Sequence, residues 1–207
     1  MANQVVVIAP HPDDEVIGCG GVICKHRRNG DSVRVIFLTS GEQGNPDMQP
    51  ESIGTLREEE ARKATQLLDV CGLHFLRLPD QAVAKNMERG VRRLRELFSS
   101  QPPDVVYAPH PAEAHRDHAP ALPFVRGATA NLSTPRVLLY EVWTPLSNPT
   151  RFEDITEFMS PKMRALRCYR SQLELIRYDH AVRGLNRFRG VMSGGCRYAE
   201  AFAEPDR

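Results

Sequence analysis

The stretch that decides the fold of this chain is Val5-Val6-Val7-Ile8-Ala9-Pro10-His11-Pro12-Asp13-Asp14-Glu15. Its opening run of apolar residues predicts a strand that is buried on both faces, as in a parallel sheet. An imidazole and two neighbouring carboxylates follow directly. Open α/β sheets bind their ligands at the carboxyl ends of their strands. The stretch therefore predicts a binding site at the end of a first strand.

A second stretch repeats this arrangement further along the chain. The apolar run 105–108 leads into Pro109-His110-Pro111, and His115-Arg116-Asp117-His118 follows. If 105–108 is a strand beside the first one, both polar stretches lie at the same edge of the sheet. Histidine and aspartate are ligands that suit a zinc-like metal. We therefore expect one site assembled from both stretches.

Strand-like and helix-like segments alternate along the chain, which favours an α/β fold: a three-layer α/β/α Rossmann-like sandwich with a mainly parallel sheet. We expect strands at 5–9, 33–38, 73–78, 105–108 and 136–143. Helices are expected at 15–28, 52–70, 88–98 and 161–175, with one more after His118. Residues 39–52 and 144–151 are predicted loops, and the rest of the C-terminal part is predicted to be irregular. The length suits one domain, 1–207, with 144–207 as a C-terminal extension of it.

Composition narrows the functional classes. The net charge of +1 favours neither nucleic acid nor an acidic membrane as a partner. No apolar stretch approaches the ~20 residues of a membrane-spanning helix, and the first strand begins too early to leave room for a signal peptide. The five cysteines are scattered and form no CxxC pair. We therefore expect a cytoplasmic protein without a disulfide framework.

The first motif predicts a hydrolytic metal centre. Such zinc sites typically use three protein ligands and keep a position open for water. His11 and Asp14 can supply two ligands, and bound zinc would lower the pKa of its water from ~15.7 towards ~7. Asp13 is adjacent and could act as the general base. In the alternative interpretation, the two aspartates only cap the following helix.

The second motif offers the third ligand. His118 is the best candidate, and His110 is the alternative. His115 is then free to donate a proton or to stabilise an oxyanion, with Asp117 placed to orient it and keep it cationic. The remaining histidines lack such companions and are predicted to be structural or on the surface: His26, His74 and His180.

Residues 10–15 together with 115–118 resemble the motifs of the PIG-L/LmbE-type zinc deacetylases, which remove acetyl groups from substrates that contain N-acetylglucosamine. The resemblance extends over most of the chain. It includes Thr39-Ser40-Gly41-Glu42, Leu56-Arg57-Glu58-Glu59-Glu60-Ala61, Leu78-Pro79-Asp80, and residues 162–172 with Tyr169, Ser171 and Gln172.

The resemblance implies one Zn²⁺ per chain, held by His11, Asp14 and His118. It implies that Asp13 is the general base, that His115 is the acid or oxyanion stabiliser, and that Asp117 lies beside it. Glu42, Arg57 and Asp80 fall where family members hold sugar hydroxyls, although Arg57 could instead pair with a helix carboxylate and Asp80 could cap a turn. The chain departs from the pattern of some members at Glu113, where they carry a tyrosine.

The expected activity is removal of an acetyl group from the amide nitrogen of an N-acetylglucosamine-type sugar or glycoconjugate. One alternative is a zinc amidohydrolase that acts on a non-sugar N-acyl compound or a glycopeptide. Another is a non-catalytic sugar-binding or nucleotide-binding module, although Gly18, Gly20 and Gly21 lie inside a predicted helix and lack dinucleotide-site spacing. Family analogy also favours a homo-oligomer, in which Trp143 and the late helix could line an interface.

Overall fold

The structure is a computed structural model, and it describes residues 2–130 and 135–205. The strands are β1 (Gln4–Ala9), β2 (Ser32–Phe37), β3 (Gly72–Phe75), β4 (Val105–Pro109), β5 (Arg136–Tyr140), β6 (Arg151–Asp154) and β7 (Ala199–Ala203). The helices are α1 (Asp14–Arg28), α2 (Pro50–Leu67), α3 (Met87–Ser100), α4 (Ala121–Thr129), α5 (Met159–Leu166), α6 (Arg170–Leu173) and α7 (Tyr178–Met192), with short 3-10 turns η1 (Val83–Asn86) and η2 (Thr156–Phe158).

The described strands form one sheet in the order β3-β2-β1-β4-β5-β7-β6. Strands β1 to β5 pair in parallel, and β7 runs antiparallel to both β5 and β6. The predicted mainly parallel sheet is therefore confirmed. Because β1 and β4 are direct neighbours, their carboxyl ends carry His11 and the 110–118 segment to the same edge.

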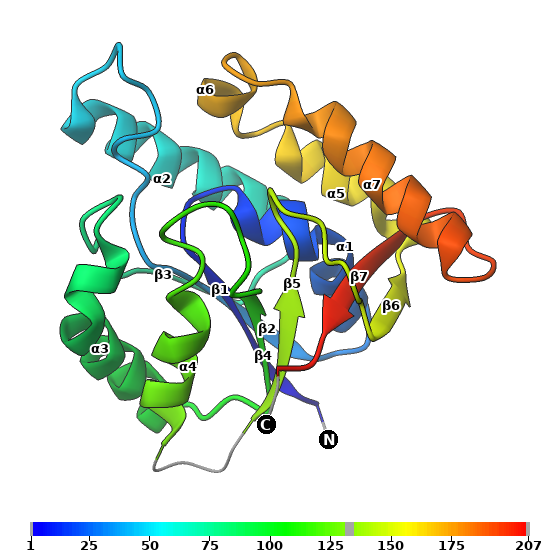
Figure 1. Ribbon diagram of the computed structural model, residues 1–207, viewed down its shortest axis with the longest axis horizontal. Coiled ribbons are helices and arrows are strands. Elements are labelled where there is room, and N and C mark those ends of the chain that lie inside the picture. Colours follow the sequence, from blue (N-terminus) through cyan, green and yellow to red (C-terminus); the bar gives the residue numbers. More distant parts are fainter. Residues whose placement is uncertain (1, 131–134, 206–207) are drawn as a thin grey trace.

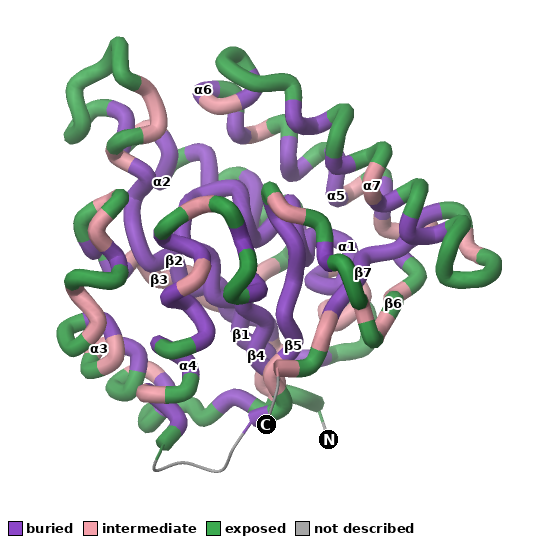
Figure 2. Tube along the Cα trace, viewed as in Figure 1, coloured by how far each residue is buried: buried purple, intermediate pink, exposed green. Residues whose placement is uncertain are grey.

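Helices cover both faces of the sheet and make three layers (Figure 1). Helices α3 and α4 lie on one face, while α1, α2, α5 and α7 lie on the other. Alternate side chains of β1 enter opposite cores: Val5 and Val7 pack with the α1 side, and Val6 and Ile8 with the α3 side. The central strands and α1 are buried along most of their length, whereas the outer surfaces of α3 and α7 are exposed (Figure 2).

A buried ion pair ties the C-terminal part of the chain to α1. Lys162 Nζ donates to Glu200 Oε1 and to the carbonyl oxygen of Ile17, each at 2.7 Å. Glu200 also accepts backbone hydrogen bonds from Gly21 and Val22 in the middle of α1. Strands β6 and β7 belong to the same sheet as the N-terminal strands. The description of 1–207 as one domain with an extension stays a prediction.

Several sequence-based expectations are wrong, mostly in the C-terminal region. The single helix expected at 161–175 is broken into α5 and α6, because Tyr169 leaves helical geometry and directs its buried hydroxyl to Glu15. Residues expected to be irregular form α7 and β7. The strands expected at 73–78 and 136–143 end earlier, at Phe75 and Tyr140. Among the described residues, no helix is long and apolar enough to cross a membrane.

Candidate active site

The loop after β1 turns sharply at Asp13, whose backbone φ is 125°. A non-glycine residue in this region carries about 1–3 kcal/mol of strain, and such residues cluster at functional sites. Two neighbours hold the loop: Thr39 Oγ1 donates to the carbonyl of Pro10 at 2.9 Å, and Arg57 Nη2 donates to the carbonyl of Pro12 at 2.7 Å. Asp13 occupies the N-cap position of α1, but its side chain makes no capping hydrogen bond. Helix capping therefore does not explain this carboxylate.

Three donor atoms from His11, Asp14 and His118 form a triangle with nearly equal sides. His11 Nδ1 lies 3.3 Å from Asp14 Oδ2, His118 Nε2 lies 3.2 Å from the same oxygen, and the two nitrogens are 3.4 Å apart. The three residues are buried, with exposed fractions of 7%, 1% and 0%. The second oxygen of Asp14 is buried without a hydrogen-bond partner. The fold thus brings together the three predicted metal ligands from both motifs.

The other ring nitrogen of His11 faces two carboxylates. His11 Nε2 lies 3.1 Å from Asp80 Oδ1 and 3.4 Å from Asp117 Oδ2. Backbone amides hold both carboxylates in place, since Gln81 N donates to each of them and Val83 N donates to Asp117. A proton on Nε2, shared with Asp80, leaves Nδ1 with its lone pair free.

Glu113 plays the corresponding part behind His118. Its Oε2 lies 3.4 Å from His118 Nδ1, and its two oxygens accept the backbone amides of residues 142–144 at 2.7–3.3 Å. Burial raises the pKa of Glu113, but the neighbouring His110 and His118 and a backbone amide outweigh it and bring the pKa to about 2. Glu113 therefore points into the protein as a carboxylate and holds the 142–144 segment. The sequence showed only that Glu113 stands where some family members carry a tyrosine, and it did not predict these contacts.

The site as a whole attracts positive charge. Burial raises the pKa of Asp14, but the charges and hydrogen bonds of His118 and His11 hold it well below its usual range. Burial lowers the pKa of His118, but Asp14 and Glu113 outweigh burial and raise it to about 9. The surrounding carboxylates likewise raise the pKa of His11 well above its usual value, against the effect of burial. Carboxylates dominate this edge, which is the electrostatic setting of a cation site.

Asp13 is held by two residues that are not part of the triangle. Tyr178, the first residue of α7, donates its hydroxyl hydrogen to Asp13 Oδ2 at 2.9 Å, and Arg57 Nη2 lies 3.3 Å from the same oxygen. Burial is the largest effect on the pKa of Asp13 and raises it to about 6, while Arg57 opposes the shift. Sequence reasoning missed Tyr178, because it lies in a segment expected to be irregular.

A pocket of about 170 Å³ opens over these residues, and His115 forms part of its wall. The backbone amide of Asp117 donates to His115 Nδ1 at 3.3 Å. Burial, followed by the nearby His11 and His118, lowers the pKa of His115. The expectation that the Asp117 carboxylate orients His115 and keeps it cationic is therefore wrong, because that carboxylate turns towards His11.

Comparison with known proteins agrees with this geometry. Residues 6–129 match the family model described as PIG-L: GlcNAc-PI de-N-acetylase. The chain belongs to the PIG-L family. This PIG-L chain is 30% identical to the diacetylchitobiose deacetylase of Thermococcus kodakarensis, over 96% of its own length and 81% of the relative's.

Two solved structures show how widely the fold is used. The PIG-L chain is 28% identical to the N,N'-diacetylchitobiose deacetylase of Pyrococcus horikoshii, covering 98% of this chain and 83% of that one, with a TM-score of 0.85. It is 22% identical to the 4-carboxy-2-hydroxymuconate hydratase GalB of Pseudomonas putida KT2440, covering 100% and 97% of the two chains, with a TM-score of 0.82. The second likeness concerns the fold alone.

The expected sugar-contacting residues of this PIG-L chain are bound largely to one another and to main chain. Arg57 Nη1 donates to the carbonyl of Gly41 at 3.2 Å, and Glu42 Oε1 accepts the backbone amide of Asp80 at 2.8 Å. Gly41 has a φ of 66°, and a Cβ there would lie 2.5 Å from Arg57 Nη1. Glycine is therefore required for this close approach. Arg57 and Asp80 line the pocket, but Arg57 forms an ion pair with Asp13 and Asp80 is hydrogen-bonded to His11.

The alternative third ligand, His110, lies apart from the triangle. Its Nε2 is 2.8 Å from the carbonyl oxygen of Thr144 and 3.3 Å from Glu113 Oε1. Elsewhere, His26 bridges Asp31 and Tyr107, in keeping with its expected structural role.

Proposed function

We propose that this chain is a metal-dependent hydrolase that removes the acetyl group from the nitrogen of an N-acetylglucosamine-type sugar or glycoconjugate. Family membership and the named activities of the two deacetylase relatives support the reaction class. A hydratase shares the fold, so the reaction must be argued from the site itself. The observation that carries the proposal is the buried triangle of donor atoms with a separately held carboxylate, Asp13, beside it.

The donor triangle fits a single zinc-like ion. Tetrahedral zinc with ligand distances of about 2.0–2.1 Å separates its donor atoms by about 3.3 Å. The observed separations are 3.2–3.4 Å without any movement of the side chains. Asp14 Oδ1, the oxygen outside the triangle, is buried without a hydrogen-bond partner, so this carboxylate has an acceptor position left for a cation. We assign the ligands as His11 Nδ1, Asp14 Oδ2 and His118 Nε2.

Two other groups could be considered as ligand sets: His11 with Asp80 and Asp117, or His11 with His115 and His118, each with donor atoms within 4.8 Å of one another. Both oxygens of Asp80 and both of Asp117 accept backbone amides, whereas in Asp14 only Oδ2 does, from the amide of His11, and Oδ1 has no partner. His115 Nδ1 likewise accepts a backbone hydrogen bond, and the residue lies partly exposed in the pocket wall. These groups are better suited to orienting a ligand and contacting substrate.

The chain's own residues supply the proton transfers. A bound zinc ion would polarise the amide carbonyl and lower the pKa of water towards ~7. In this proposal Asp13 takes the proton of the attacking water, and its pKa of about 6 keeps it ionised at neutral pH. Once protonated, Asp13 can return that proton to the leaving amine nitrogen. Tyr178 and Arg57 hold its carboxylate in one orientation during both transfers.

His115 is best suited to stabilising the oxyanion. Because its Nδ1 accepts the amide of Asp117, the neutral ring carries its hydrogen on Nε2. A lowered pKa keeps the ring neutral at pH 7, so it acts as a hydrogen-bond donor. Gln43, Gln81 and Gln172 also line the pocket, and amide side chains suit sugar hydroxyls.

A substrate panel with a matched variant tests the proposal. Purified protein is assayed for acetate release from N-acetylated sugars and from N-acyl amino compounds, before and after chelation and with zinc added back. We expect release from N-acetylglucosamine compounds that chelation abolishes and zinc restores. Asp13→Asn should keep the metal, and its rate should be lower by a factor of about 10²–10⁴. Preference for the non-sugar amides would favour the amidohydrolase alternative, and binding without turnover would favour the binding module.

A cytoplasmic location, a homo-oligomeric state and the lack of a nucleic-acid partner remain predictions.

A further inference from the structure

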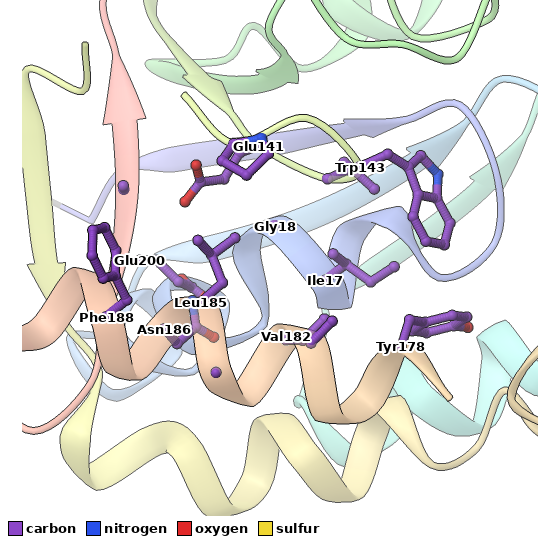
Figure 3. Close-up of a pocket in the computed structure, with 15 residues that line it drawn as sticks. Ile17, Gly18, Glu141, Trp143, Tyr178, Val182, Leu185, Asn186, Phe188 and Glu200 are labelled. Atoms are coloured by element: carbon purple, nitrogen blue, oxygen red, sulfur yellow. The ribbon is translucent and has the colours of Figure 1, made fainter. Parts of the chain in front are cut away.

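A cavity of about 440 Å³ lies beside the catalytic pocket. Helix α7 forms one wall, the 141–145 segment forms the opposite wall, α1 lies at the back, and β7 closes one end (Figure 3). This volume is within the range of about 300–1,000 Å³ that is usual for sites of small organic ligands. None of the catalytic steps proposed above uses this cavity.

The walls of the cavity are mainly apolar. The apolar side chains include Ile17, Val142, Trp143, Val182, Leu185 and Phe188. Trp143 and Phe188 are 42% and 54% exposed, so the cavity is open at its rim. Large side chains that remain exposed around one hollow are typical of a binding surface.

The two carboxylates in the wall are already neutralised. Arg189 donates to both oxygens of Glu141, at 3.1 and 2.6 Å. Lys162 and two backbone amides of α1 bind Glu200 at 2.7–2.8 Å. Neither carboxylate is left to attract a cation, and Asn186 Oδ1 is the one buried side-chain polar atom without a partner among the described lining residues. The cavity therefore suits an apolar group, which would lose few hydrogen bonds on leaving water.

Trp143 and Tyr178 connect this cavity to the catalytic pocket. Trp143 lines both hollows. Tyr178 lines the cavity with its ring and holds Asp13 with its hydroxyl. The two rings meet edge to face, with centroids 5.5 Å apart (Figure 3). One ligand can therefore reach from the catalytic pocket into the cavity along Trp143.

We propose that this cavity binds an apolar aglycone, an alkyl or aryl group linked to the sugar of the substrate. The inference rests on the proposed deacetylase function. The scissile amide must lie at the buried end of the pocket, near Asp14 and His118, which are 1% and 0% exposed. Trp143 lines both hollows, and the aglycone on C1 is the neighbour of the acetamide on C2, so a chain on C1 is the substrate part that can follow Trp143 from the catalytic pocket into the cavity. The preferred substrate then differs from chitobiose, whose second unit is a polar sugar.

Two substrates test this specificity: the methyl and n-hexyl β-glycosides of N-acetylglucosamine. We expect a KM for the hexyl glycoside that is at least about tenfold lower, because the chain leaves water for an apolar wall. Leu185→Gln places an amide in the cavity wall and should reduce the ratio of the two KM values, methyl over hexyl glycoside, to about threefold or less. Met192→Gln is the matched control, since Met192 lies on the same helix, is 65% exposed and is not part of the cavity wall. It should keep the full ratio.

Fluorescence provides a readout that does not depend on turnover. Trp143 is the single tryptophan of the chain. Hexyl β-glucoside, which has no acetamide, should shift its emission to shorter wavelengths at concentrations where methyl β-glucoside has no effect. The shift should be lost in Leu185→Gln and kept in Met192→Gln.

The outcomes separate this inference from the proposed function. If neither glycoside releases acetate, the proposed function fails. The fluorescence titration then shows by itself whether the cavity binds an apolar group. If acetate is released with equal KM values, or if Leu185→Gln and Met192→Gln behave alike, the apolar-aglycone site is rejected. An emission shift that follows protein concentration without ligand, together with a dimer in sedimentation, would assign the cavity to a second copy of the chain and also overturn the proposal.

Discussion

Tyr178 and Asp13 are 165 residues apart in the sequence, yet the tyrosine hydroxyl donates to Asp13 Oδ2 at 2.9 Å. This contact joins the first residue of α7 to the loop after β1, where Asp13 is held at a φ of 125°. The C-terminal part of the chain thus reaches the proposed general base directly. Removing the Tyr178 hydroxyl should therefore change the pKa of Asp13 as well as the stability of the fold.

Tyr178→Phe should move the acidic limb of the pH profile of kcat/KM to higher pH. The hydrogen bond from Tyr178 lowers the pKa of Asp13, so its loss raises that pKa. Asp13 must be ionised to accept a proton, and activity is therefore lost at a higher pH as the solution is acidified. A shift of about one pH unit is expected from one hydrogen bond to a charged group. Tyr198→Phe is the control, because it also removes a tyrosine hydroxyl but not one that contacts Asp13. It should leave the acidic limb unchanged, and equal shifts in both variants would contradict the role of Tyr178.

Asp80→Asn separates two roles for Asp80. Its Oδ1 lies 3.1 Å from His11 Nε2, so the change weakens the orientation of a proposed metal ligand. We expect metal affinity to fall about 10–100-fold, with kcat and KM restored by excess zinc. Metal competition with a chelating dye gives the affinity. A raised KM at full metal occupancy would instead show that Asp80 contacts the sugar.

Glu113→Gln should affect both His118 and the segment that carries Trp143. The glutamine keeps one acceptor oxygen, whereas Glu113 uses both of its oxygens for backbone amides of residues 142–144. The negative charge beside His118 Nδ1 is also lost. We expect metal affinity to fall about 10–100-fold and the emission of Trp143 to change. An unchanged emission spectrum would argue against the role of Glu113 in holding this segment.

Gly90→Ala tests the packing of α3 against α4 away from the site. A Cβ at Gly90 would lie 1.9 Å from the ring of Phe124, which is fully buried. The free energy of unfolding should fall by about 1–3 kcal/mol. Gly184→Ala is the matched control, because it also lies inside a helix and a Cβ there meets nothing within 4 Å. It should stabilise the protein by up to about 1 kcal/mol in urea denaturation, and similar losses in both variants would reject the steric explanation.

The sequence alone determined the parts of this protein that depend on local patterns. The apolar run before His11 and the polar residues after it predicted β1, its position in a parallel sheet and the edge where a site would form. The same reasoning at 105–118 predicted β4 beside β1, which the sheet confirms. Both predictions rest on neighbouring residues, and parallel topology then brings strand ends together without further information.

Only the tertiary structure decided the partners of these residues. β7 is a short strand rich in alanine, so its own preference for extended structure is weak, and its pairing with β5 and β6 determines its conformation. The position of α7, and with it Tyr178, depends on that pairing and on burial against α1. The orientation of Glu113 and of Asp117 also follows from backbone amides that other loops supply. Such contacts join residues far apart in the chain, so no local pattern in the sequence encodes them.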